Sequence, residues 1–220
     1  MTTPISPAKR RLGADEDSMY EWLMLHRSQV TWSVLVVLAA IAVFWFFQRQ
    51  KAIKAERAET QFFQARQAAA AGNLPLAISD LQKVATRYDG TRAGTQASLS
   101  LAQAYYDQKK YKEGIDALKK AESKAPADFK PSVHVLEADG YEELRNFVAA
   151  AEQYKLAAAA TSFPAEKAQY QSAAARNYMS AGKNTEAKAI WTELAKDETG
   201  PEAAEARVRL GEVAAKAMSL

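Results

Sequence analysis

The chain has 220 residues, with 29 Lys and Arg against 26 Asp and Glu, two histidines and no cysteine. The lack of cysteine excludes a disulfide framework, thiolate metal sites and a cysteine nucleophile, and two histidines leave little basis for histidine chemistry. The 46 alanines, beside only 9 glycines and 7 prolines, are typical of a helical protein, and the net charge is +3.

The N-terminal region is predicted to contain a flexible tail and a short helix. Residues 1–17 contain two prolines and a basic run, and they are expected to form the tail. Ser18 followed by Glu21 matches a capping box. This pattern predicts a membrane-flanking helix over residues 18–29.

A single apolar segment follows. The sequence from Val30 to Phe47 contains no charged residue. As a helix, the uncharged window 28–48 would be roughly 31 Å long, about the thickness of a bilayer core. Because the segment ends in Trp-Phe-Phe without a small-residue cleavage site, a retained anchor is favoured over a cleaved signal peptide. The sequence therefore predicts a transmembrane anchor over residues 30–48.

The whole net charge lies just after this anchor. Residues 49–66 carry five basic and two acidic side chains, whereas residues 1–29 and 67–220 are each balanced. Residues 49–57 are predicted to be a basic juxtamembrane helix whose side chains can meet lipid phosphates. Basic residues number four before the anchor and five after it, so charge does not fix the orientation. The predicted anchor flanks are Trp22, Arg27, Trp32, Trp45, Arg49 and Lys51.

Residues 58–201 contain a repeat with a period of 36–37 residues. A first column of small residues consists of Ala65, Ala102, Ala138, Ala175 and Gly211. A tyrosine follows three positions later at Tyr105, Tyr141 and Tyr178. A second small column, Ala77, Gly114, Ala150 and Ala187, precedes a large one, Leu81, Leu118, Tyr154 and Trp191. Turns within the units are expected at Gly72-Asn73, Lys109-Lys110, Arg145-Asn146 and Gly182-Lys183.

This pattern predicts an all-α solenoid of four antiparallel helix pairs, in which stacking buries faces that one pair cannot bury alone. Residues 202–220 repeat only the first-helix pattern and are predicted to form a capping helix. The unit resembles the tetratricopeptide repeat, which has small residues on both helices and an aromatic late in the first. It departs from that family where Gln61, Ser98 and His134 replace the large residue that opens the first helix.

Two further features resemble a narrower group. Glu21-Trp22-Leu23 and His26-Arg27 precede one anchor and a charged helix that continues into the repeats, and the first unit ends Tyr88-Asp89-Gly90-Thr91 before Ala97-Ser98-Leu99. Together they are similar to single-span tetratricopeptide proteins of the bacterial inner membrane, which include the ancillary subunit of the Sec translocon. The resemblance implies a short cytoplasmic N-terminus, a periplasmic repeat domain, and contacts with the translocon and periplasmic chaperones.

The candidate binding surface follows from the same resemblance, because the first helices line the groove of such repeats. Mixed apolar, aromatic and charged side chains there suit an extended peptide or a partner helix. Packing between units is an equally consistent role for each residue taken singly. The groove residues predicted are Phe62, Arg66, Leu99, Gln103, Tyr106, Val135, Asp139, Glu142, Ser172, Arg176 and Met179.

Other classes of site find no support in the sequence. It has no glycine-rich phosphate loop, nucleophile elbow or metal-spaced histidine cluster, so no catalytic residue, cofactor or metal is predicted. Lysines 109–124 interleave with acidic residues, which argues against nucleic-acid binding. The predicted function is a membrane-anchored protein-interaction scaffold that assists translocation or envelope chaperones. The alternative is a structural subunit of a larger respiratory or photosynthetic membrane complex.

Overall fold

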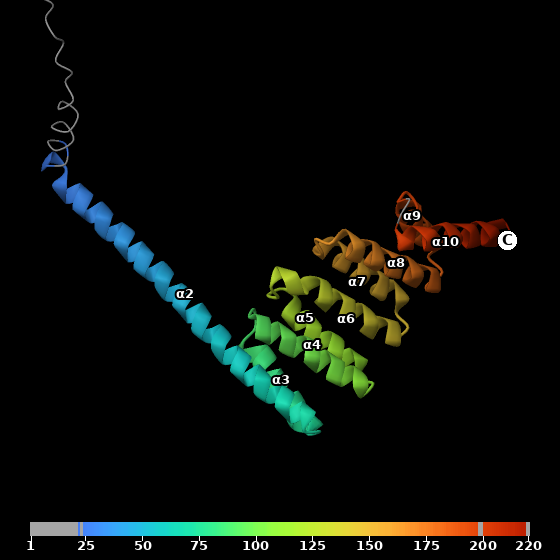
Figure 1. Ribbon diagram of the computed structural model, residues 1–220, viewed down its shortest axis with the longest axis horizontal. Helices are drawn as coiled ribbons and strands as arrows, with labels where there is room; N and C mark the ends of the chain where they lie inside the picture. The colour runs from blue at the N-terminus through green and yellow to red at the C-terminus, as the bar shows by residue number, and fades with distance from the viewer. Residues whose placement is uncertain (1–21, 23, 198–199, 219–220) are drawn as a thin grey trace, which may run out of the picture. The chain divides into compact units, whose positions relative to one another are not determined.

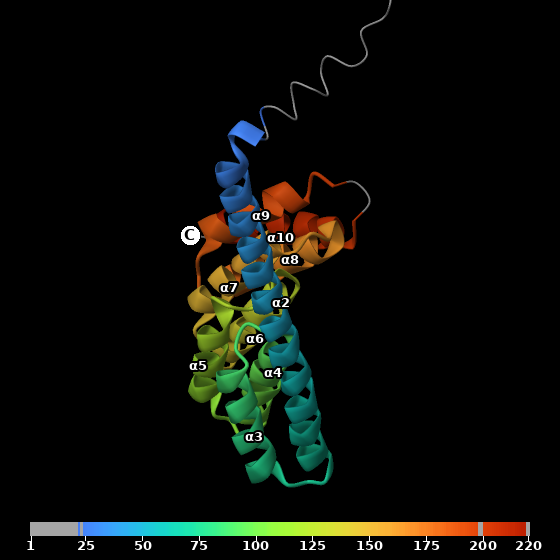
Figure 2. The ribbon, with the colours of Figure 1, turned by 90° about the vertical axis from the view of Figure 1, so that its left-hand side faces the viewer.

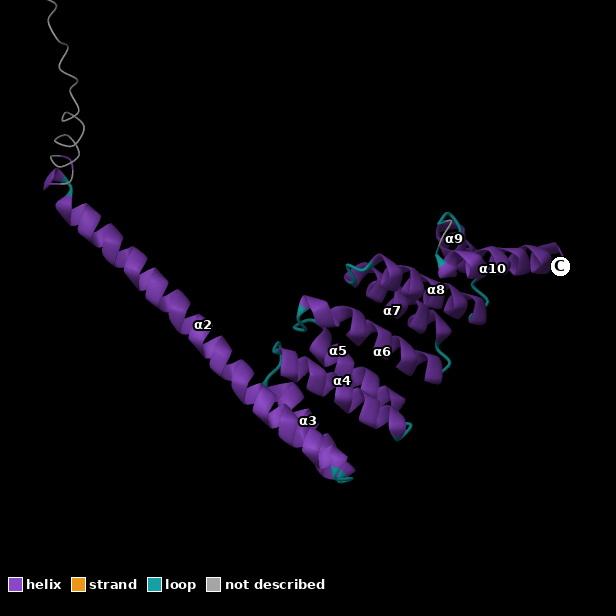
Figure 3. Cartoon of the chain, in the orientation of Figure 1, coloured by secondary structure: helices purple, strands orange, loops and turns teal. Residues whose placement is uncertain are grey.

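The computed structural model describes Trp22, residues 24–197 and residues 200–218, and this part of the chain consists of helices and loops (Figure 3). The chain divides into two compact parts, Met1–Ala52 and Ile53–Leu220, which are considered separately. The expected tail at 1–17 and the start of the expected flanking helix at 18–29 lie outside the described residues.

The first part is dominated by one long helix. Helix α2 comprises Arg27–Ala70, 44 residues, and continues into the second part without a break. It is long and apolar enough to cross a membrane, and the apolar stretch has no side chain buried within the protein. Exposing so many apolar side chains to water is unfavourable, so this helix is a candidate membrane span.

The second part is a stack of antiparallel helix pairs (Figures 1 and 2). Residues 53–70 of α2 pair with α3 (Leu74–Arg87) to form repeat 1. Repeats 2, 3 and 4 are α4 (Arg92–Asp107) with α5 (Tyr111–Glu122), α6 (Lys130–Glu143) with α7 (Phe147–Ala160), and α8 (Pro164–Ser180) with α9 (Asn184–Leu194). A short 3₁₀ turn, Ala127–Phe129, precedes α6, and α10 (Pro201–Met218) follows α9.

Burial confirms the repeat register. The first small column, Ala65, Ala102, Ala138 and Ala175, is 0% exposed in all four repeats. The second small column is also buried, as are the large residues that follow it, from Leu81 to Trp191. Small side chains let the paired backbones approach, and the large residues fill the space around each contact. Gly211, the fifth member of the first column, is exposed on α10.

The turns within the repeats also lie where they were predicted. Gly72, Lys109, Arg145 and Gly182 all adopt a left-handed backbone, with φ between +57° and +77°. Only two of the four are glycine, so a glycine is not needed to end the first helix. A side chain in this conformation costs about 1 kcal/mol, which the packing of the flanking helices offsets.

Contacts between successive repeats use tyrosines of the first helices. The ammonium of Lys119 lies 5.5 Å from the ring centre of Tyr141, and that of Lys155 lies 5.8 Å from the ring centre of Tyr178. Tyr106 donates a hydrogen bond of 2.9 Å to the carbonyl oxygen of Leu136. These contacts join repeat 2 to repeat 3, and repeat 3 to repeat 4.

The Tyr106 ring fits between repeats 2 and 3 because two glycines make room for it. A Cβ added at Gly114 would lie 2.3 Å from Cε1 of the ring, and one at Gly140 would lie 2.3 Å from the hydroxyl oxygen. Both distances are far below van der Waals contact, so a side chain at either position would displace the tyrosine.

Candidate protein-interaction site

A shallow hollow of about 410 Å³ lies on the surface formed by the first helices of repeats 2, 3 and 4. We call it the first-helix hollow, and it is lined by Leu99, Ser100, Gln103, Ser132, Val135, Leu136 and Tyr170. None of these side chains is charged. The hollow therefore offers aliphatic, aromatic and uncharged polar contacts, a combination that suits a segment of a partner polypeptide.

Three of the predicted groove residues line this hollow. Leu99 and Gln103 come from α4, and Val135 comes from α6. They lie together because equivalent positions of successive first helices share one side of the stack. Gln103 is exposed and donates a hydrogen bond of 3.0 Å to Asp107 on its own helix.

Other predicted groove residues pack within the fold. Phe62 is 8% exposed and Tyr106 is 9% exposed, and both belong to the hydrophobic core. Ser172 is buried and donates to Glu205, while the half-buried Met179 accepts a hydrogen bond from the Trp191 indole at 3.4 Å. These side chains pack in the interior, below the surface that the first helices form.

The predicted charged residues of repeats 3 and 4 are engaged by neighbouring helices. Asp139 accepts a hydrogen bond of 2.9 Å from the Tyr154 hydroxyl, and burial raises the pKa of its carboxyl despite that bond. Glu142 accepts a bond of 2.5 Å from the Asn177 amide. Arg176 pairs with Glu205 of α10 at 2.8 Å. Arg66, by contrast, is exposed near the Phe62 ring.

Sequence reasoning missed four lining residues, Ser100, Ser132, Leu136 and Tyr170. It also missed Phe63, which is 60% exposed although its neighbour Phe62 is buried. A signal was present, because positions 63, 100 and 136 form a column of their own, one residue after 62, 99 and 135. To choose between adjacent columns, one must know how each helix is rotated about its own axis. The repeat period alone does not give this rotation.

The predicted anchor flanks in the first part are exposed. Trp22, Trp32 and Trp45 are 56%, 69% and 65% exposed, and Arg27, Arg49 and Lys51 are exposed as well. Aromatic and basic side chains with this exposure are free to contact lipid headgroups. Their role at a membrane surface remains a prediction.

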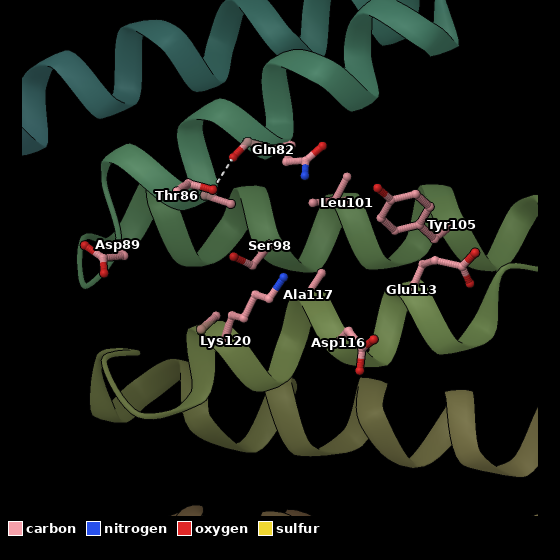
Figure 4. Close-up of a pocket in the computed structure, with 12 residues that line it drawn as sticks. Gln82, Thr86, Asp89, Ser98, Leu101, Tyr105, Glu113, Asp116, Ala117 and Lys120 are labelled. Carbon is pink, nitrogen blue, oxygen red and sulfur yellow. Dashed lines mark hydrogen bonds between the residues drawn. The ribbon is translucent and has the colours of Figure 1, made fainter.

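A second hollow lies between α3 and α5, with α4 as its floor (Figure 4). This α3–α5 crevice has a volume of about 320 Å³. Its polar lining comes from Gln82, Thr86, Asp89, Ser98, Tyr105, Glu113, Asp116 and Lys120, and its apolar lining comes from Ala85, Leu101, Ala117 and Ala121. Asp89 is held by the ammonium groups of Lys124 and Lys54, which lower the pKa of its carboxyl although burial acts in the opposite direction.

The corresponding space between α5 and α7 contains side chains. The repeat places Glu122, His134 and Gln153 where the crevice has Ala85, Ser98 and Ala117. His134 is buried, and its Nδ1 lies 2.9 Å from Oε1 of Gln153, while its Nε2 lies 3.9 Å from Oε1 of Glu122. The α3–α5 crevice is open because its residues at these positions are small.

Glu137 of α6 is the most unusual buried residue. It is 0% exposed, and neither carboxylate oxygen has a hydrogen-bond partner in the described part of the chain. Burial, followed by repulsion from Glu122, raises its pKa to about 7, although Lys119 acts in the opposite direction. The described residues contain no cluster of three or more His, Asp or Glu side chains placed to hold a metal ion.

Comparisons with known proteins agree with this architecture. The family described as tetratricopeptide repeat-like domain matches residues 21–137, and the tetratricopeptide repeat family matches residues 172–219. A search of curated proteins gave no significant match. Tetratricopeptide repeats are typically scaffolds for protein–protein interaction and are not usually catalysts.

Two of the solved structures, both with TM-scores above 0.5, share the fold. TPR-like repeats of a Podosopora anserina protein described as a kinesin light chain superpose with a TM-score of 0.53 at 16% identity, over 72% of this chain and 86% of that one. A variant of the same repeats gives 0.52 at 17% identity, over 72% and 85%. A thermophilic TPR protein of Thermus thermophilus gives 0.44 at 22% identity, over 71% and 80%. With the family match covering more than half of its residues, this chain belongs to the tetratricopeptide repeat-like domain family.

Proposed function

We propose that the protein is a non-catalytic scaffold, anchored in a bacterial inner membrane by α2, that binds protein partners through the first-helix hollow. The repeats lie in the periplasm, and the protein assists protein translocation or envelope chaperones. The observation that carries the proposal is that first helices of three successive repeats converge on one hollow without a charged side chain.

The chemistry of the hollow favours an uncharged, apolar partner segment. Charged side chains nearby, such as Asp139 and Glu142, are already bound by Tyr154 and Asn177. Burial of aliphatic and aromatic groups would supply most of the affinity. Binding of this kind should depend little on salt, since screening weakens interactions between charges.

The membrane and translocation parts of the proposal rest on the N-terminal half. The family match begins at residue 21, so it includes the apolar stretch of α2 as well as the first repeats. The sequence around Trp22 and Arg27 resembles that of inner-membrane tetratricopeptide proteins associated with the translocon. A reporter fused after Leu220 should be active only outside the cytoplasm, and cytoplasmic activity would contradict the proposed orientation.

Partner binding can be tested with one charge placed in the hollow. Ser132 is an exposed residue of its lining, so Ser132→Glu should leave the fold intact and disfavour an apolar ligand. We expect proteins that co-purify with the full chain from membranes to be depleted severalfold. Ser79→Glu makes the same change at an exposed position of α3 outside the hollow and should retain them.

Retention of the same partners by both variants would contradict binding in the hollow. If those partners were also present at fixed stoichiometry, the alternative function would be favoured, a structural subunit of a larger membrane complex. The melting temperature of each variant serves as the check that the repeats remain folded.

A further inference from the structure

The α3–α5 crevice has the properties of a ligand site that is separate from the first-helix hollow. At the next junction of the stack, the same space is filled by the side chains of Glu122, His134 and Gln153, with His134 in contact with the other two. The chain therefore shows that polar groups can be accommodated at this position. Between repeats 1 and 2, the smaller Ala85, Ser98 and Ala117 stand at the equivalent positions, and a volume of about 320 Å³ stays open.

Lys120 supplies the positive charge of the crevice lining. Figure 4 shows its side chain extending from α5 toward the middle of the crevice, near Ser98 and Ala117. Asp116 lies one turn earlier on α5, a spacing that favours an ion pair, yet Lys120 has no ion pair or hydrogen bond in the described part of the chain. The equivalent lysine of repeat 1, Lys83, pairs with Asp80 at 2.8 Å. The Lys120 ammonium is thus available to an anion.

Two further donors enter from other helices. The carboxamide of Gln82 and the hydroxyl of Tyr105 lie across the crevice from Lys120 (Figure 4). The other hydroxyls already donate to backbone carbonyls, Thr86 to Gln82 at 2.8 Å and Ser98 to Gly94 at 3.1 Å. A carboxylate has two oxygens that accept several hydrogen bonds, which matches an ammonium, an amide and a hydroxyl.

The other lining residues restrict the size and charge of the part of the ligand beyond its carboxylate. Ala85, Leu101, Ala117 and Ala121 provide an apolar surface for a short aliphatic group. Asp89 is neutralised by its two lysines, but Glu113 and Asp116 would repel a second negative charge. In Figure 4 the carboxylate of Asp116 points away from Lys120. A ligand with one negative charge therefore suits this lining better than a ligand with two.

We propose that the α3–α5 crevice binds a small apolar monocarboxylate, with the carboxylate on Lys120 and the aliphatic group against Leu101. The ligand is either a free branched-chain acid or the C-terminal carboxylate of a protein that ends in an aliphatic residue. Both share the same chemistry and can be distinguished by the choice of probe.

Binding is measured by saturation-transfer NMR on the full chain in lipid nanodiscs, with empty nanodiscs as the blank. The probes are isovalerate, its uncharged amide isovaleramide, and the peptide N-acetyl-Ala-Ala-Val with a free carboxyl. We expect isovalerate to bind and isovaleramide to bind roughly tenfold more weakly. Tighter binding of the peptide than of isovalerate would identify a protein C-terminus as the source, and the reverse would identify a free acid.

Substitution of the lysine tests the site itself. Lys120→Gln removes the charge from an exposed side chain and should weaken isovalerate binding roughly tenfold. Lys83→Gln changes the equivalent lysine of repeat 1, which lies outside the crevice, and should leave binding unchanged. Equal binding of isovalerate and isovaleramide, no binding of either carboxylate probe above the blank, or full binding by Lys120→Gln would each overturn the proposal.

A second variant copies the neighbouring junction. Ala85→Glu with Ser98→His introduces the residues that stand at positions 122 and 134, so the crevice would be filled by the chain itself. We expect isovalerate binding to be lost while the melting transition of the repeats is retained. Unchanged binding by this folded variant would place the ligand elsewhere and contradict the assignment.

Discussion

The junction between repeats 1 and 2 and the junction between repeats 2 and 3 have the same helix arrangement but different interiors. The first contains an open crevice with Ala85, Ser98 and Leu101 along its walls and floor. The second is filled, with His134 buried and Glu137 fully inaccessible at the position equivalent to Leu101. The period thus determines the course of the backbone, whereas a few side chains decide whether a junction is open or contains a buried carboxyl group.

The largest effect should come from disrupting the repeat register. Ala138 is 0% exposed where α6 meets α7, so Ala138→Trp would force an indole between two closely packed backbones. Overpacking of this size should cost about 3 kcal/mol and lower the temperature of the cooperative melting transition or abolish it. Gly211→Trp changes the equivalent exposed position of α10 and should melt nearly as the natural protein does. Equal melting of both variants would mean that the register is wrong.

The second largest effect should come from the buried glutamate of the filled junction. The pKa of Glu137 is raised from 4.5 to about 7, so the folded state binds its proton more tightly than the unfolded state does. Its contribution to stability is therefore fully present below pH 4.5 and is lost as pH rises to about 7, amounting to about 3 kcal/mol.

Glu137→Leu places the residue found at Leu101 in this position and removes the titration. As pH rises from acidic to mildly alkaline, the free energy of unfolding of the variant should increase by about 3 kcal/mol relative to that of the natural protein. Urea unfolding across that pH range measures the difference. Glu113→Leu is the control, because it removes an exposed glutamate from the neighbouring helix α5. An unchanged pH dependence in Glu137→Leu would show that Glu137 does not carry the effect.

A smaller effect is expected from the tyrosine that joins repeats 2 and 3. Gly140→Ala would place a methyl group 2.3 Å from the Tyr106 hydroxyl and should cost about 2 kcal/mol through displacement of the ring. Tyr106→Phe alone should cost about 1 kcal/mol, because it loses the hydrogen bond to Leu136. Removing that hydroxyl should also make Gly140→Ala less costly, so the two changes should be non-additive in a double-mutant cycle. Strict additivity would contradict the contact.

The smallest effect concerns the ion pairs at the open junction. Asp89 contacts Lys54 and Lys124, but all three side chains are at least one-third exposed, so screening limits the contribution of the pairs. Asp89→Asn should cost about 0.5 kcal/mol near neutral pH and less at high salt. Because the pKa of Asp89 is lowered, this contribution should disappear as pH falls below its usual range. A cost independent of salt would argue against an electrostatic role.

The fold could be predicted from the sequence because small residues recur at positions that must be buried. Ala65, Ala102 and Ala138 marked the helix contacts, and the turn positions followed from their spacing. The binding surface was harder, since Phe62 and Phe63 differ by only one position, or about 100° around the helix. One is buried and the other is exposed. Only the three-dimensional packing distinguishes them.

The interiors of the junctions were not anticipated either. Glu137 stands in a helical column whose other members include Leu101 and Ala174, and that contrast was the available signal. In a sequence with many exposed acidic residues, nothing distinguishes one buried glutamate from the exposed ones. The open crevice likewise depends on three small residues from three helices, Ala85, Ser98 and Ala117, which the chain brings together only when folded.

Binding of partners in the first-helix hollow can be tested by site-specific photocrosslinking in intact membranes. A photoreactive residue replaces Leu99 in the hollow or, as the matched control, the exposed Leu156 of α7. The proposal predicts a discrete partner crosslinked from position 99 and not from position 156, with a yield that is similar at low and high salt. Equal crosslinking from both positions, or crosslinks from neither while the anchor helix is labelled, would contradict the claim.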